Sequence, residues 1–78
     1  MKKKKEAFEI WNIEEEFEQS CGSMIEALDN CLEYSFYGFD NERKNKFPKN
    51  WLIIKNGKLL RTVKVTFEGA LSWVIHNQ

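Results

Sequence analysis

The chain has few of the residues that mark secreted, membrane-bound or metal-binding proteins. Cys21 and Cys31 are the only cysteines and form no CxxC motif, and His76 is the only histidine. Three such ligands without metal-site spacing predict neither a metal nor another cofactor. No apolar run approaches the roughly eighteen residues of a membrane span, and acidic residues follow the lysine run at 2–5 where a signal peptide would be apolar. We therefore expect a cytoplasmic protein with two reduced, buried or half-buried thiols.

Catalytic motifs are equally scarce. The sequence has no glycine-rich phosphate loop, no GxSxG, and no histidine and acid arranged around a nucleophile. The carboxylates of Glu14, Glu15 and Glu16 resemble a solvated run more than an acid and base pair with separated pKa values. We expect a protein that binds and is not an enzyme.

What the chain does have is enough apolar material for one small core. Its 78 residues are 42% apolar and 14% aromatic, which predicts a single folded domain spanning 1–78. A standard interface of about 800 Å² per partner would cover a large share of so small a surface.

Charge is divided along the chain although the net charge is zero. Residues 6–40 contain ten carboxylates and no lysine or arginine, whereas residues 41–78 contain eight basic residues against Glu42 and Glu68. Four further lysines form a basic N-terminal tail at 1–5. The two halves either neutralise each other when folded or present a bipolar surface to partners.

The N-terminal segment admits two interpretations. Residues 7–13 (A-F-E-I-W-N-I) are rich in β-formers and partly alternate, with Phe8 and Ile10 on one side and Trp11 and Ile13 on the other, which favours a strand. A helix remains open, because Asn12 could cap one.

An amphipathic helix is predicted at about 23–37. Ser23 and Glu26 have the spacing of a capping box, and the apolar face would contain Met24, Ala27, Leu28, Cys31, Leu32 and Ser35. The opposite face is an acidic stripe that ends in a tyrosine: Glu26, Asp29, Glu33 and Tyr37. Gly38 would end the helix and lead into a basic surface loop at 39–50.

A β-hairpin is predicted at 51–65, because Asn56-Gly57 separates two β-rich runs and suits a type I′ turn. Regular alternation would place Leu52, Ile54, Leu59, Arg61, Val63 and Val65 in the core. The other face would expose Trp51, Ile53 and Leu60 among lysines. Thr66 is a plausible cap for a short C-terminal helix at about 67–76, with a strand through residues 71–75 as the alternative. The elements together predict an α+β fold, a small two-layer domain.

Three functions compete. The first is a protein-binding regulator or inhibitor that uses Glu26, Asp29, Glu33 and Tyr37 to occupy a basic surface of a larger protein; by analogy alone, it could be a phage or mobile-element inhibitor of a nucleic-acid enzyme, in the manner of anti-CRISPR proteins. The second is a nucleic-acid-binding module that uses Lys49, Trp51, Lys55, Lys58 and Lys64. The third is a structural or homo-oligomer-forming module.

Overall fold

The computed structural model describes residues 7–41 and 47–76 and confirms the α+β class. The elements in chain order are β1 (Phe8–Asn12), β2 (Phe17–Cys21), α1 (Met24–Asn41), β3 (Lys49–Lys55), β4 (Lys58–Val65) and α2 (Phe67–His76). The predicted basic tail at 1–5 and the central part of the predicted basic loop, 42–46, lie outside the described residues. None of the described helices is both long and apolar enough to cross a membrane.

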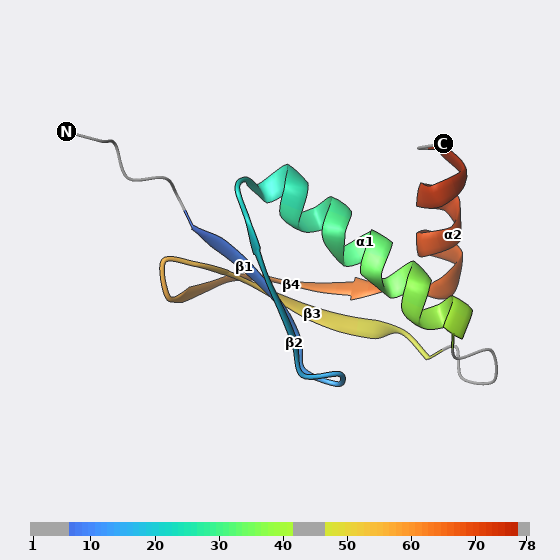
Figure 1. The fold of residues 1–78 in the computed structure, drawn as a ribbon, viewed down its shortest axis with the longest axis horizontal. Helices are drawn as coiled ribbons and strands as arrows, with labels where there is room; N and C mark the ends of the chain where they lie inside the picture. Colours follow the sequence, from blue (N-terminus) through green and yellow to red (C-terminus); the bar gives the residue numbers. More distant parts are fainter. Residues whose placement is uncertain (1–6, 42–46, 77–78) are drawn as a thin grey trace.

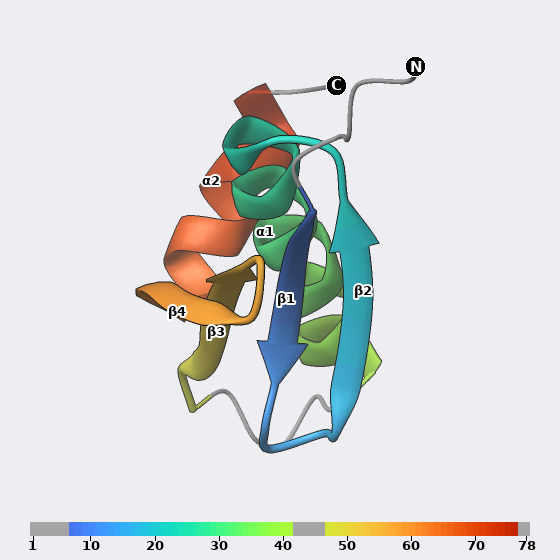
Figure 2. The same ribbon diagram turned by 90° about the vertical axis from the view of Figure 1, so that its left-hand side faces the viewer.

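The four strands form one antiparallel sheet in the order β2-β1-β3-β4 (Figure 1). The N-terminal hairpin and the Asn-Gly hairpin therefore meet through β1 and β3. Both helices lie on the same side of the sheet, with α1 packed against the strands and α2 packed against α1 (Figure 2).

The core lies between α1 and the covered face of the sheet. Ile10 and Ile53 pair across β1 and β3, and neither is exposed to solvent. Ala27 and Cys31 are fully buried on the facing side of α1, as the helical pattern predicts. Ala70 of α2 joins the same cluster, and the Phe67 ring meets the Phe39 ring edge to face at 5.7 Å.

The N-terminal segment is a strand, and the alternative of a helix is wrong. Phe8 and Ile10 lie on the buried side, whereas Trp11 lies on the other side. Asn12 does cap a turn, because its Oδ1 accepts hydrogen bonds from the backbone N–H groups of Glu14 and Glu15 at 3.1 and 3.3 Å. That turn leads into β2, a strand that the mostly polar sequence F-E-Q-S-C does not predict.

Helix α1 begins as predicted and ends later than predicted. Ser23 caps the helix as predicted, because the backbone N–H of Glu26 donates to Ser23 Oγ at 3.1 Å; the return bond of the capping box is shifted by one residue, with the backbone N–H of Gly22 donating to Glu26 Oε1 at 2.8 Å. Gly38 does not end the helix, which runs on to Asn41. A Cβ at Gly38 would lie 2.7 Å from Lys49 Cε, so this glycine is needed for close approach and not for a turn.

The predicted loop at 39–50 is correspondingly too long. Its first three residues, 39–41, belong to α1, and Phe39 is buried. Its last two, Lys49 and Asn50, begin β3. The remaining basic residues of this segment, Arg43, Lys44 and Lys46, are outside the described residues.

The Asn-Gly hairpin has the predicted turn but not the predicted faces. Asn56 and Gly57 have φ angles of 51° and 82°, as a type I′ turn requires. Ile54 pairs with Leu59, yet Ile53 pairs with Arg61, so Leu60 is an additional residue that forms a β-bulge. Trp51 and Ile53 consequently share the covered face with Val63 and Val65, and the prediction that Trp51 and Ile53 are exposed is wrong.

The C-terminal segment is a helix, as predicted. The Oγ1 of Thr66 accepts a hydrogen bond from the backbone N–H of Gly69 at 3.0 Å, and the Thr66 carbonyl accepts one from the backbone N–H of Ala70 at 3.0 Å. The cap fixes where α2 leaves β4 and directs Phe67 towards α1.

Candidate partner-binding groove

A carboxylate-rich turn connects β1 to β2 and forms one end of the candidate site. The turn consists of Ile13, Glu14, Glu15 and Glu16, all of them exposed. Glu16 adopts a left-handed conformation with φ 53°, which is uncommon for a residue other than glycine, asparagine or aspartate. The two hydrogen bonds to Asn12 hold this turn, with its three consecutive carboxylates, at the end of the sheet.

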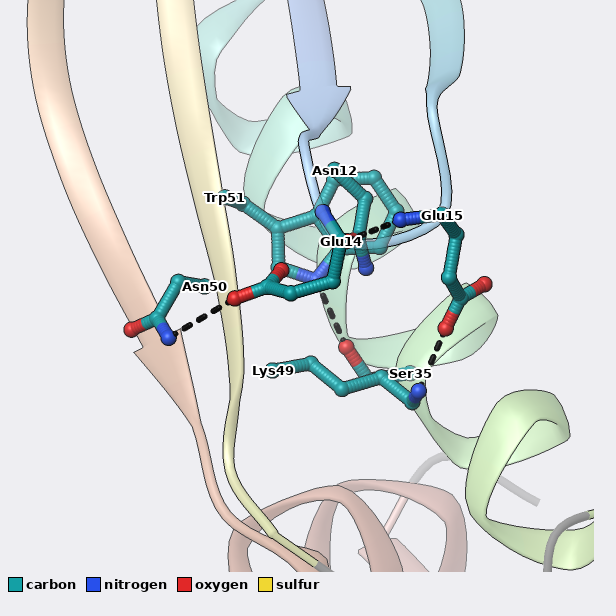
Figure 3. Close-up of polar contacts among 7 residues, drawn as sticks. All are labelled: Asn12, Glu14, Glu15, Ser35, Lys49, Asn50 and Trp51. Atoms are coloured by element: carbon teal, nitrogen blue, oxygen red, sulfur yellow. Dashed lines mark hydrogen bonds and ion pairs between the residues drawn. The ribbon is translucent and has the colours of Figure 1, made fainter.

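Side chains from β3 fix this turn in place (Figure 3). Lys49 forms an ion pair with Glu15, and Asn50 Nδ2 donates a hydrogen bond to Glu14 Oε1 at 3.0 Å. Lys49 is only 8% exposed, and its ammonium lies 5.5 Å from the centroid of the Phe39 ring. The lysine of the pair is therefore shielded although the Glu15 side chain is 39% exposed, and the contact anchors the turn to the start of β3.

An aromatic groove lies beside this anchored turn, between β2 and the C-terminal half of α1. It has a volume of about 390 Å³ and is lined by Glu15, Phe17, Tyr34, Tyr37 and Gly38. Glu15 therefore meets three aromatic side chains in the groove. Tyr34 and Tyr37 lie three residues apart on α1, and Phe17 begins edge strand β2. We call this site the acidic groove.

The floor of the acidic groove is fixed by the core. The Phe17 ring meets the Tyr34 ring at 4.8 Å and the Trp51 ring at 5.8 Å, in both cases edge to face. Trp51 is in turn held by Ser35, whose Oγ accepts a hydrogen bond from the indole Nε1 at 2.7 Å (Figure 3). A groove with so rigid a floor loses little conformational entropy when a partner binds.

The predicted acidic stripe of α1 exists, but its four residues have different surroundings. Glu26 is engaged in the capping box, and Asp29 accepts a hydrogen bond from Trp73 Nε1 of α2 at 3.4 Å. Glu33 is half-buried, and Tyr37 is 53% exposed and lines the acidic groove. Glu26 and Asp29 are thus engaged in the helix cap and in the contact with α2, whereas Glu33 and Tyr37 belong to the half of the stripe nearest the groove.

The predicted basic hairpin site is not assembled as one surface. Trp51 is 1% exposed and cannot stack on a base, and Lys49 is buried beside Glu15. The Lys55 ammonium lies 5.3 Å from the centroid of the Phe8 ring, on the covered side of the sheet. Lys58 of β4 is the cross-strand neighbour of Lys55. Lys64 points to the opposite face, because the bulge shifts the alternation of β4.

Sequence reasoning missed Glu15, Phe17 and Tyr34 as groove residues. Glu15 belongs to a run that we interpret as solvated, and Phe17 lies in a strand whose sequence, F-E-Q-S-C, is mostly polar. The alternation of Phe17, Gln19 and Cys21 on one side was the available signal. It is weak because only two of the three residues are apolar.

Both cysteines are free and lie in the core. Burial raises the pKa of Cys31 from 9.0 to about 12, with a smaller contribution from neighbouring Cys21. Burial also raises the pKa of Cys21, against a lowering effect of the hydrogen bond from Asn30, and Glu26 adds to the rise. Neutral thiols are poor nucleophiles and poor metal ligands, so their chemistry near pH 7 is that of packing.

Comparisons with protein-family models, with curated proteins and with solved structures found no match to this chain.

Proposed function

We propose that the chain is a protein-binding regulator or inhibitor that uses the acidic groove to hold a basic segment of a larger protein. The observation that supports this most directly is the groove itself, where Glu15, Tyr34 and Tyr37 meet around a rigid aromatic floor. Tyrosine is enriched at interface hot spots, and the faces of aromatic rings attract lysine and arginine.

The charges around the groove favour the same class of partner. Glu14 and Glu16 flank Glu15 in the turn, and Glu33 precedes Tyr34 on α1, while the cation described at this site, Lys49, already pairs with Glu15. A basic segment would be attracted at a distance and then aligned by these carboxylates. Nucleic-acid enzymes have basic surfaces of this kind, and we propose one as the target class.

The nucleic-acid-binding alternative has less support. Its stacking residue, Trp51, is buried, and its lysines are divided between two faces of the sheet. We include a cytoplasmic location in the proposal because Cys21 and Cys31 are free thiols within the core.

The test is affinity capture with matched variants. The full chain is immobilised as wild type, as Glu33→Lys with Tyr37→Ala, and as Glu68→Lys, a control of the same charge change at an exposed position on α2. We expect a protein captured by the wild type and by the control to be lost from the groove variant by at least about tenfold. Its binding to the wild type should also weaken as salt is raised.

Equal capture by the groove variant and the wild type would contradict the proposal. Circular dichroism of each variant shows whether it folds. A photo-cross-linking residue at position 37 should become attached to the captured protein, whereas one at position 68 should not.

A further inference from the structure

The face of the sheet that points away from α1 carries an apolar stripe. No helix or strand among residues 7–41 and 47–76 covers this face, which we call the open sheet face (Figure 2). Its stripe consists of Trp11, Leu52, Ile54 and Leu59. Leu59 is 60% exposed, and the other three are half-buried.

The strand register makes the stripe continuous. Trp11 of β1 lies opposite Leu52 of β3, and Ile54 of β3 lies opposite Leu59 of β4. Trp11 Nε1 donates to Glu9 Oε1 at 3.2 Å, which ties the indole to its own strand. Leu52, Ile54 and Leu59 alternate along the sequence as core residues do, but the bulge at Leu60 leaves them on the uncovered side of the sheet.

Charges flank the stripe with opposite signs. Glu18 of edge strand β2 lies on one side and Lys64 of edge strand β4 lies on the other, while Glu9 of the inner strand β1 lies opposite Ile54 and is bonded to Trp11. Thr62 and Asn50 supply neutral polar groups between them. The open sheet face is therefore acidic at one edge, apolar in the middle and basic at the other edge.

We propose that the open sheet face binds the same face of a second copy of this chain. A two-fold axis parallel to the strands exchanges the two edges, so that β1 faces β3 and β2 faces β4 of the second copy. Trp11 then packs on the second copy's Leu52, and Glu18 lies opposite its Thr62, two residues along β4 from its Lys64, each contact occurring twice. An axis perpendicular to the strands would instead place the acidic edge strand β2 opposite β2 and the basic edge strand β4 opposite β4, which like charges disfavour.

The size of the face sets the strength of the association. Four strands about 4.8 Å apart and about six residues long cover roughly 400 Å² per copy, about half of a standard interface. We therefore expect a weak dimer that forms at high protein concentration. The acidic groove lies between α1 and β2 on the covered side, so it stays accessible in the dimer and the two sites act separately.

The test is a charge exchange measured by sedimentation equilibrium from micromolar to millimolar protein. Wild type should change from monomer to dimer, and Glu18→Lys and Lys64→Glu should each weaken the dimer about tenfold or more, because each puts like charges together twice. An equimolar mixture of the two variants should dimerise again, since the heterodimer has two attractive pairs. Glu68→Lys on α2 should behave as wild type.

A second variant removes the apolar contact. Leu52→Lys should abolish dimerisation in every combination, including the mixture, while circular dichroism reports its folding. A wild-type chain that stays monomeric at millimolar concentration overturns the proposal, as does a mixture that dimerises no better than its components. Loss of the dimer in Glu68→Lys would also overturn it, by showing that association runs through another surface.

Discussion

The indole Nε1 of Trp51 donates a hydrogen bond of 2.7 Å to Ser35 Oγ in the centre of the core. Neither side chain has contact with solvent beyond 1% of its surface. This bond joins β3 to α1 and fixes the ring on which Phe17, the floor of the acidic groove, is packed. One polar contact therefore contributes both to stability and to the shape of the groove.

Replacement of Ser35 by alanine should destabilise the fold by about 1–3 kcal/mol, because the buried indole N–H then has no acceptor. Urea unfolding followed by tryptophan fluorescence measures the change. Ser20→Ala is the matched control, since Ser20 is exposed on β2, and should change the free energy of unfolding by less than about 0.5 kcal/mol. Equal effects of the two substitutions would show that the bond contributes nothing.

Gly38 and Lys49 should be energetically coupled. Alanine in place of a helical glycine normally stabilises by about 1 kcal/mol. Here the new Cβ would lie 2.7 Å from Lys49 Cε, so the lysine must move away from Glu15. Gly38→Ala should therefore bring no gain in the wild-type chain and about 1 kcal/mol in a Lys49→Ala background, as a double-mutant cycle of urea unfolding would measure. The same gain in both backgrounds would contradict the close contact.

The Asn-Gly turn should be sensitive at its second residue. Gly57 has a φ of 82°, and no neighbouring atom lies within 4 Å of a Cβ built there. Gly57→Ala should still destabilise by about 1 kcal/mol, because the cost arises from the backbone conformation and not from crowding. Thermal unfolding compared with Lys58→Ala, an exposed neighbour, separates the two causes. A wild-type melting temperature for Gly57→Ala would show that the turn relaxes to another type.

Much of the fold could be predicted because it depends on local signals. The capping box at Ser23, the cap at Thr66 and the Asn-Gly turn each act over four residues or fewer. The faces of the second hairpin could not be predicted, because the bulge at Leu60 reverses the alternation and has no glycine or proline to mark it. Which face of the sheet α1 covers depends on the side chains of all four strands, not on this hairpin alone.

The candidate site could be predicted only in part, for a similar reason. Tyr37 stands out in the sequence as an aromatic residue at the end of an acidic stripe. Its groove partners Glu15 and Phe17 come from a turn and a strand about twenty residues away, and they meet Tyr37 only once β2 is placed at the edge of the sheet. A contact of this kind is long-range and leaves no pattern in a single sequence.

Cys31 should make the stability of the fold depend on alkaline pH. Its pKa is 9.0 in an exposed chain and about 12 in the folded core, chiefly because burial disfavours the thiolate. Between these values the unfolded chain loses the thiol proton and the folded chain keeps it, so the free energy of unfolding falls as pH rises. Below pH 9 both states are protonated, and the contribution is constant.

Cys31→Ala isolates this effect from the lysines and tyrosines that titrate in the same range. The variant loses a buried sulfur at every pH, but the difference in unfolding free energy between wild type and variant should shrink from pH 9 towards pH 12, as urea unfolding at each pH would measure. Cys31 should also react with a thiol reagent only as fast as the chain opens, because it is fully buried. A difference that stays constant across this range would mean that Cys31 ionises in the folded chain as readily as in the unfolded one, and that the space between α1 and the sheet is open to water.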